Sequence, residues 1–209
     1  MQEGKLYHHG DLRAALLKAT AELLQENGVD KFTLRECARR AGVSHAAPAH
    51  HFGDTQGLLT AYATSGFIRL ADEMVRGRAA CDGNVLMALH AVGMAYIRFA
   101  VSNPSLFDLM FRSRLINTDD GSYLLASKQT FGHLQDALAC LDAGASADAP
   151  EFQVRCQLAW SVVHGISALT LDAGLCAQGA GESALNAEAQ AGALLEQLAP
   201  SLMPPEPKH

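Results

Sequence analysis

The chain has 209 residues, and 49% of them are hydrophobic, which is enough to bury the core of one ordinary domain or of two small ones. Its formal net charge of −6 disfavours nucleic-acid binding when taken alone, because nucleic acids attract basic surfaces. The longest apolar stretch, near residues 85–95, is interrupted by His90 and falls short of the roughly 20 residues that span a bilayer. The first residues also lack the apolar core of a secretory signal, so we expect a cytoplasmic protein with no membrane segment.

The charge is unevenly distributed along the chain. The first 60 residues hold 7 of the 16 Lys and Arg and 7 of the 22 Asp and Glu, so the acidic excess lies entirely in the later part. Between residues 31 and 52, Glu36 stands alone against the basic residues Lys31, Arg35, Arg39 and Arg40. A local basic patch is therefore predicted on a chain that is acidic as a whole.

The five cysteines are widely spaced and include no CxxC pair, which argues against a disulfide framework and against a zinc ribbon. We expect them to be reduced core residues; they are Cys37, Cys81, Cys140, Cys156 and Cys176. His45, His50 and His51 are close in sequence, but Asp54 is the one Cys or carboxylate ligand near them. We therefore predict no metal and no cofactor.

Ala, Leu, Glu and Gln recur at helical spacing, and strand signals are sparse. The predicted fold class is therefore all-α, with about nine helices: a three-helix head at the N-terminus and a helical bundle as the C-terminal body. The first helix carries Leu12, Leu16, Ala19 and Leu23 on one face. It ends near Gly28, since glycine suits a left-handed C-cap.

Two short helices around a glycine turn are predicted within residues 33–52. Thr33 and Glu36 fit a capping box, in which each side chain satisfies a free backbone N–H at the start of the first helix. Gly42 supplies the tight turn, and Ser44 is expected to cap the second helix. This arrangement is typical of a helix-turn-helix, whose second helix enters the major groove of DNA.

The outward face of this segment is chemically suited to DNA. Its predicted members are Arg35, His45, Ala47, His50 and His51. Arginine can bond guanine O6 and N7 together, histidine can donate to phosphate or base acceptors, and an alanine methyl can meet a thymine methyl. Backbone amides at Thr33 and Ser44 offer phosphate sites. The alternative is that the arginines form only a solvated helix face.

Six further helices are predicted after the head. They are expected over 54–78, over 85–101, from 104, and over 121–141, 151–173 and 183–198. The helix over 85–101 is apolar on nearly every face, so we expect it to be buried at the centre of the bundle.

Several side chains of this body are candidates for a ligand cavity. They are Tyr96, Phe99, Met110, Phe111, Trp160 and His164. Aromatic residues at helical spacing are also typical of plain core, so both interpretations stay open. A polar stripe on the helix over 151–173, which consists of Gln153, Gln157, Ser161 and His164, must face either water or a lined pocket.

The stretch FTLRECARRAGVSHAAPAHHFGDTQGLLTAYA resembles the DNA-binding signature of the tetracycline-repressor (TetR/AcrR) family of regulators. The preceding segment, LYHHGDLRAALLKATAELLQENG, is similar to the first helix of that family. Further along, WSVVHGISALTL is similar to the Trp-His-Gly signature in the ligand-binding domain of one subgroup.

This resemblance implies roles for single residues. Arg35 and His45 match positions that touch base edges, and a second group matches positions near base edges or phosphates: Thr33, Ala47, His50 and His51. Many members have tyrosine at the position of Ala49 and lysine at the position of Thr55, and both usually grip phosphate. Thr55 can still donate a hydroxyl to phosphate.

The resemblance also implies an organisation: a DNA-binding domain over 1–55, an effector-binding and dimerisation domain over 56–200, and a flexible tail over 201–209. The protein is then expected to be a repressor that binds palindromic double-stranded operator DNA as a homodimer formed through its last two helices. A small, partly apolar effector releases it. The rival classes are a helical-bundle enzyme and a protein-binding adaptor, but no predicted helix carries a Glu-x-x-His pair, the one match being Glu206 to His209 in the tail, and the chain has no GxSxG motif.

Overall fold

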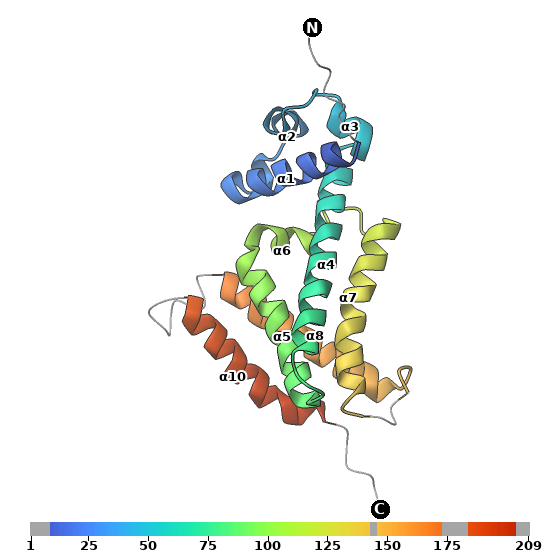
Figure 1. The fold of residues 1–209 in the computed structure, drawn as a ribbon, viewed down its shortest axis with the longest axis vertical. Coiled ribbons are helices and arrows are strands. Elements are labelled where there is room, and N and C mark those ends of the chain that lie inside the picture. Colours follow the sequence, from blue (N-terminus) through green and yellow to red (C-terminus); the bar gives the residue numbers. More distant parts are fainter. Residues whose placement is uncertain (1–8, 143–145, 173–183, 204–209) are drawn as a thin grey trace, which may run out of the picture. The chain divides into compact units, whose positions relative to one another are not determined.

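The structure is a computed structural model that describes residues 9–142, 146–172 and 184–203 (Figure 1). Within these ranges it contains helices and no strand, which confirms the all-α prediction. In chain order the helices are α1 (His9–Asn27), the 3-10 helix η1 (Val29–Lys31), α2 (Leu34–Ala41), α3 (Ala47–Phe52), α4 (Thr55–Ala79), α5 (Val85–Ser102), α6 (Pro104–Met110), α7 (Gly121–Ala139), α8 (Pro150–Leu171) and α10 (Ala184–Leu202).

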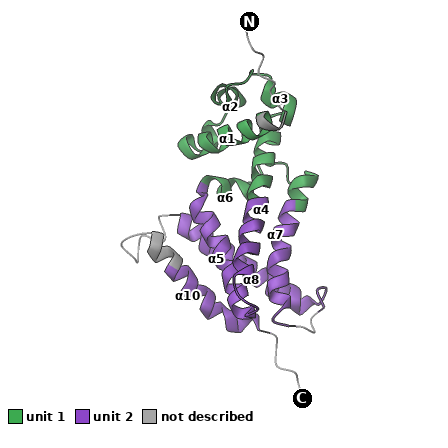
Figure 2. Cartoon of the chain, viewed as in Figure 1, with its two compact units in different colours: residues 1–67, 105–125 green, residues 68–104, 126–209 purple. Residues whose placement is uncertain are grey.

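The chain divides into two compact units, shown in different colours in Figure 2. Unit 1 comprises Met1–Phe67 and Ser105–Leu125, and unit 2 comprises Ile68–Pro104 and Ala126–His209. The segment 105–125 therefore packs with the N-terminal head, although it is distant from the head in sequence. α10 continues to Leu202, beyond the predicted end at residue 198, while residues 204–209 of the predicted tail lie outside the described residues.

The core of the head forms where α1 meets α2 and the start of α4. Leu16, Ala19 and Leu23 of α1 pack with Cys37 and Leu58, and all five are buried. Partly buried residues complete this core, including Leu12, Leu34, Val43 and Phe52. The predicted apolar face of the first helix is thus confirmed. Burial of this face holds α2 and α3 against α1.

A second apolar layer of unit 1 involves α4, α6 and the start of α7. The Phe67 ring meets the rings of Phe111 and Tyr123 edge to face, with centroids 5.6 and 5.4 Å apart. A Cβ on Gly66 would lie 2.6 Å from the Met110 sulfur, so α4 and α6 approach closely because position 66 has no side chain.

Unit 2 is built around α5, whose second half is buried against its neighbours. By length and composition α5 could cross a membrane, but half of it is buried inside the protein, as expected of a core helix. The expectation that the whole helix is buried is wrong for its first turns, where Leu86 and Met87 are 49% and 58% exposed.

Candidate functional site

Only half of the predicted capping box forms at the start of α2, the first helix of the helix-turn-helix. The Thr33 hydroxyl accepts a hydrogen bond of 3.2 Å from the Glu36 backbone N–H. The Glu36 carboxylate does not complete a capping box, because it binds the Arg39 guanidinium at 2.8 and 2.6 Å instead. At the other end Gly42 adopts φ 68°, the left-handed conformation that glycine accommodates without strain.

The second helix, α3, begins at Ala47 rather than after Ser44. Its N-cap is Ala46, without a side-chain cap, so the prediction that Ser44 caps this helix is wrong. The Ala47 N–H instead closes a turn on the Ser44 carbonyl at 3.0 Å. Pro48 lies in the first turn of α3, where its fixed φ favours helix initiation and its missing N–H costs little.

None of the predicted DNA-contacting residues is buried in the core of the head. Six of them are exposed and two are half-buried: Thr33, Arg35, Ser44, His45, His50 and Thr55 in the first group, and Ala47 and His51 in the second. The opposite side of α3 is anchored by buried Pro48 and by Phe52, over which the Arg13 guanidinium lies 5.5 Å from the ring centroid.

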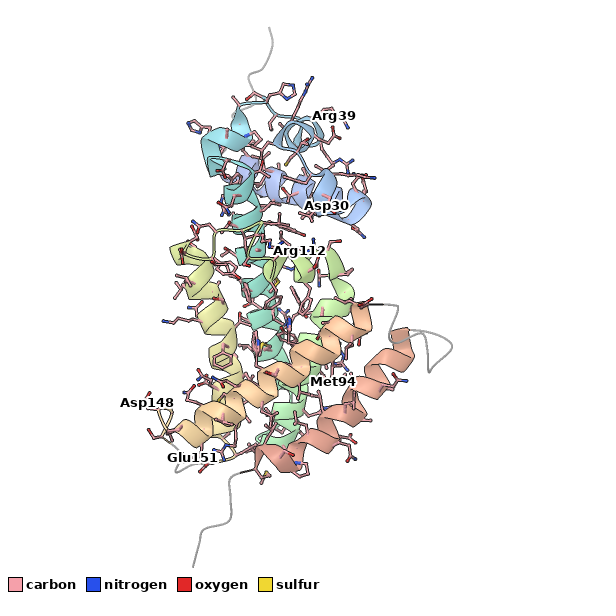
Figure 3. All side chains as sticks on the ribbon, turned by 180° about the vertical axis from the view of Figure 1, so that it is seen from behind. Asp30, Arg39, Met94, Arg112, Asp148 and Glu151 are labelled. Atoms are coloured by element: carbon pink, nitrogen blue, oxygen red, sulfur yellow. The ribbon has the colours of Figure 1, made fainter. Side chains whose placement is uncertain are left out.

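The basic patch is smaller than the sequence suggests, because two of its arginines are paired. Arg39 projects from α2 (Figure 3) and binds Glu36, while Arg40 binds Glu26 of α1 at 2.5 and 2.7 Å. These hydrogen bonds hold the pKa of the Glu36 and Glu26 carboxyls below their usual range. Within the described residues Arg35 has no ion pair, unlike the other two arginines of α2.

Four of the six predicted cavity residues belong to unit 2. Tyr96 and Phe99 are fully buried on α5, and the Tyr96 hydroxyl lies within hydrogen-bond distance, 2.9 Å, of His164 Nδ1 on α8. The Trp160 ring packs edge to face on Tyr96, with centroids 5.2 Å apart. Burial raises the pKa of Tyr96 and lowers the pKa of His164, so both side chains are held in their neutral forms.

The other two predicted cavity residues belong to unit 1. Met110 is fully buried on α6, and Phe111 packs on Phe107 and Phe67 with centroids 5.1 and 5.6 Å apart. The six candidates thus fall into two groups in different compact units.

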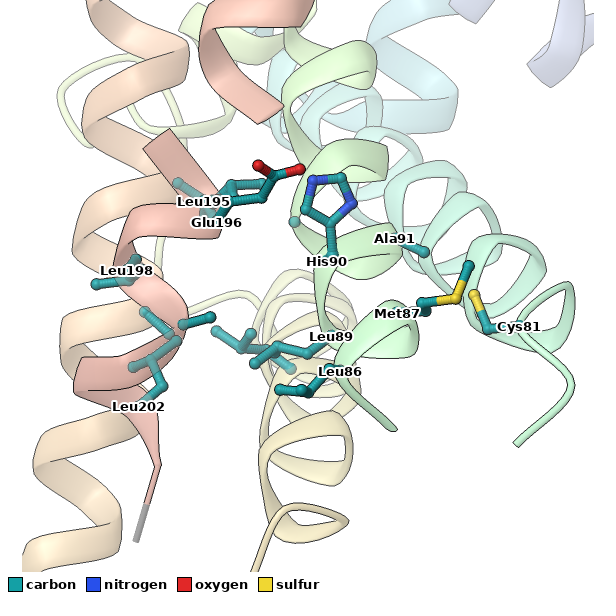
Figure 4. Close-up of a pocket in the computed structure, with 15 residues that line it drawn as sticks. Cys81, Leu86, Met87, Leu89, His90, Ala91, Leu195, Glu196, Leu198 and Leu202 are labelled. Atoms are coloured by element: carbon teal, nitrogen blue, oxygen red, sulfur yellow. The ribbon is translucent and has the colours of Figure 1, made fainter. Parts of the chain in front are cut away.

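A hollow in unit 2 has a volume of about 530 Å³ and lies between α5, α8 and α10 (Figure 4). None of the six predicted cavity residues lines it. The described residues also contain no group of three or more His, Cys, Asp or Glu side chains that could hold a metal ion.

Two comparisons with known families cover most of the chain. The profile described as "Bacterial regulatory proteins, tetR family" matches residues 16–62, which include α2 and α3. The profile described as "Tetracyclin repressor-like, C-terminal domain" matches residues 89–194, about half of the chain. The chain belongs to the TetR family of DNA-binding transcriptional regulators.

Individual relatives of this TetR-family regulator agree with that assignment. The HTH-type transcriptional regulator BetI of Klebsiella pneumoniae (strain 342) is 36% identical over 81 residues, which are 38% of this chain. The chain therefore spans about two fifths of the length of this curated relative, 42%. The TetR family transcriptional regulator PfmR from Thermus thermophilus shares the fold, with a TM-score of 0.63 and 17% identity over 88% of this chain and 96% of that one.

A solved protein of unknown function from Rhodococcus sp. RHA1 matches over almost the whole length of this TetR-family chain. It has a TM-score of 0.79 and 29% identity, and the match covers 96% of this chain and 100% of that one. The resemblance of residues 160–171 to the Trp-His-Gly subgroup stays a prediction.

Two further residues fix the recognition helix of this TetR-family regulator, and the sequence reasoning missed them. The Asp54 carboxylate accepts a hydrogen bond of 2.8 Å from the Gly57 N–H and so caps α4. A Cβ on Gly57 would lie 1.9 Å from the Phe52 carbonyl oxygen, so the turn from α3 into α4 requires glycine there. The Asp54-x-x-Gly57 spacing was the signal that could have revealed this cap.

Proposed function

We propose that this protein is a homodimeric repressor that binds palindromic double-stranded operator DNA through α2 and α3 and is released by a small, partly apolar effector. It has no enzymatic role in this proposal and acts in the cytoplasm. The exposed surface that carries Arg35, His45 and His50 is the main support, because it rests on a buried core and offers a free guanidinium to the major groove.

The contrast between two arginines of α2 makes this proposal specific. Arg35 is exposed and has no ion pair among the described residues, whereas Arg39 is neutralised by Glu36. An arginine that reads a base must replace its hydrating water by guanine, and breaking an ion pair with a carboxylate first would add to the cost. We therefore assign base recognition to Arg35 and a local structural role to Arg39.

The dimer is proposed to form through α8 and α10, the last two helices. One face of α8 carries exposed apolar side chains and small residues at helical spacing: Val154, Leu158, Ser161, Gly165, Ala168 and Leu169. A Cβ on Gly165 would meet no atom within 4 Å, so a second helix can approach there. Leu194 of α10 is 53% exposed, and an isologous contact would cover these side chains.

The effector is proposed to act within unit 2, because a regulator of this kind needs a ligand that prefers one of two states. Tyr96, Trp160 and His164, three of the six sequence-based candidates for its pocket, lie together in this unit, with Tyr96 buried and the other two half-buried. Ligand binding would then change the spacing of the two heads, and this change would weaken operator binding.

The experiment that tests the DNA-binding part has two steps. The bound DNA is first selected from a genomic library, and its sequence logo is compared between the parent protein, Arg35→Ala and Arg39→Ala. Arg35→Ala should cost about 1 to 3 kcal/mol and relax preference at one base position. Arg39→Ala is the matched control, because it removes an arginine of the same helix that already binds Glu36.

An unchanged logo for Arg35→Ala would remove this residue from base recognition. Absence of any selected DNA for the parent protein would contradict the proposed repressor function itself. Equal losses for both variants would mean that the arginines act only through general charge.

A further inference from the structure

The hollow between α5, α8 and α10 has the size and lining of a ligand pocket. Its volume of about 530 Å³ lies within the range of roughly 300 to 1,000 Å³ that is typical of small-molecule sites. α5 contributes Leu86 and Leu89, α8 contributes Ala159 and Val163, and α10 contributes Leu195 and Leu202. The pocket is therefore apolar over most of its wall.

Part of this apolar wall is exposed. Leu86 is 49% exposed and Met87 is 58% exposed, and both line the hollow from the first turn of α5. Water against such a concave apolar surface is unfavourable, and an apolar molecule that displaces it gains free energy.

One polar atom in the wall lacks a partner. The Nε2 atom of His90 is buried, and no hydrogen-bond partner for it exists among the described residues. Buried ring nitrogens are normally satisfied, so a buried one without a partner is a position where a ligand atom can bind. By contrast, His164 in the same unit already has the Tyr96 hydroxyl at 2.9 Å.

Glu196 of α10 lies opposite His90. Both residues line the pocket, and Figure 4 shows the Glu196 carboxylate pointing toward the imidazole ring. Among the described lining residues Glu196 is the one carboxylate, and none is Lys or Arg. His90 and Glu196 also line an adjoining hollow, together with Arg98. Both His90 Nε2 and the Glu196 carboxylate can accept hydrogen bonds, so this end of the pocket favours a group that donates them.

We propose that this pocket, rather than the Tyr96 cluster, is the effector site, and that it takes an amphiphile with an apolar body and a hydrogen-bond-donating head. The head is an ammonium or hydroxyl group that bonds His90 Nε2 and the Glu196 carboxylate. The apolar body covers Leu86 and Met87 and extends toward Leu202. This inference rests on the proposed ligand-responsive function.

The head group is tested with three probes of equal chain length: decylamine, decanol and decanoate, each below its micelle concentration. Binding to the full chain is measured by calorimetry, and release of the selected operator is measured by gel shift. The amine and the alcohol should bind at least about tenfold more tightly than decanoate, since loss of one charge-assisted hydrogen bond is worth that much. Tightest binding of decanoate, or equal binding of all three, would overturn the assigned head group.

The site is tested with His90→Leu and with Ala199→Phe, which places a ring in the hollow. Both variants should bind the amine about tenfold more weakly or worse. The melting temperature of His90→Leu should not fall, because the substitution removes a buried nitrogen that has no partner. His133→Leu is the matched control, since His133 lies on α7 and lines a different hollow of unit 2.

The outcomes separate this inference from the proposed function. If an amphiphile releases the operator equally well from the parent, His90→Leu and Ala199→Phe, the effector site lies elsewhere while the repressor function stands. If no probe binds the parent protein and operator binding is intact, the assigned pocket and ligand class are wrong. If Ala199→Phe does not fold, His90→Leu alone decides.

Discussion

The Thr60 hydroxyl accepts a hydrogen bond of 2.8 Å from the backbone N–H of Asn117, 57 residues away in the sequence. The same hydroxyl donates to the Gln56 carbonyl at 2.7 Å, so it links the first turns of α4 to the loop between α6 and α7. Both residues belong to unit 1, together with the DNA-reading head. This bond is one reason why segment 105–125 packs with the head.

Replacing Thr60 by valine tests that link. Thr60→Val keeps the shape of the side chain but leaves the Asn117 N–H without its acceptor, so the free energy of unfolding should fall by about 1 kcal/mol. Hydrogen exchange of the Asn117 amide should speed up. Thr60→Ser, which keeps the hydroxyl, is the control and should exchange like the parent. Equal protection in Thr60→Val would show that the bond contributes nothing.

Gly57→Ala should destabilise the head. Alanine normally favours a helix over glycine by about 1 kcal/mol, but here its Cβ would lie 1.9 Å from the Phe52 carbonyl oxygen. The α3–α4 turn must then open, and we expect a loss of more than about 1 kcal/mol together with loss of operator binding. Gly132→Ala on α7, where a Cβ meets nothing within 4 Å, should instead be neutral or stabilising. Thermal unfolding of both variants checks the opposite signs.

Thr55→Lys should strengthen operator binding. Thr55 is exposed at the first position of α4, which directly follows the predicted helix-turn-helix, so a lysine there could reach a phosphate of bound DNA. An added phosphate contact should steepen the slope of log affinity against log salt by about 1. Titrations at several salt concentrations measure that slope. Thr55→Gln is a neutral control of similar reach and should leave it unchanged, and an unchanged slope for the lysine variant would place residue 55 away from phosphate.

Leu158→Glu should break the proposed dimer. The side chain is 39% exposed on the apolar face of α8, and burying a carboxylate without a partner against a second copy is strongly unfavourable. Light scattering should then report a monomer, and operator affinity should fall because two half-sites are no longer bound together. Leu125→Glu on α7, where leucine is 58% exposed, is the control and should stay dimeric. If Leu158→Glu remains dimeric, the dimer interface does not include this face of α8.

Stability should depend on pH through His164. Burial lowers its pKa in the folded protein, so the unfolded chain binds a proton more readily. The contribution of His164 to stability is therefore complete above the unfolded pKa of about 6.5 and is lost as pH falls below it. Denaturant unfolding from pH 7 to pH 5 should give a smaller decrease for His164→Gln than for the parent. His133→Gln should retain the parental decrease, and equal slopes in all three proteins would exclude His164.

Local sequence determined the architecture of the head. Thr33 caps α2 because its hydroxyl lies within reach of the free backbone N–H three residues later. Gly42 ends α2 because glycine tolerates the positive φ that the C-cap requires. Both effects act within one helical turn. The apolar spacing of α1 likewise predicted the face that is buried. The prediction that Ser44 caps α3 was wrong. Pro48 restricts φ in the first turn and so favours a helix start at Ala47.

The tertiary structure alone decided which side chains remain available for function. Arg40 is neutralised by Glu26, 14 residues away, and the Tyr96 hydroxyl is matched by His164, 68 residues away, so neither pairing follows from helical spacing. Packing of α5 against α10 also brings His90 and Glu196 to one hollow that the aromatic pattern did not predict. Caps and turns are set by neighbours in sequence, whereas ion pairs, satisfied polar atoms and pockets depend on which helices meet.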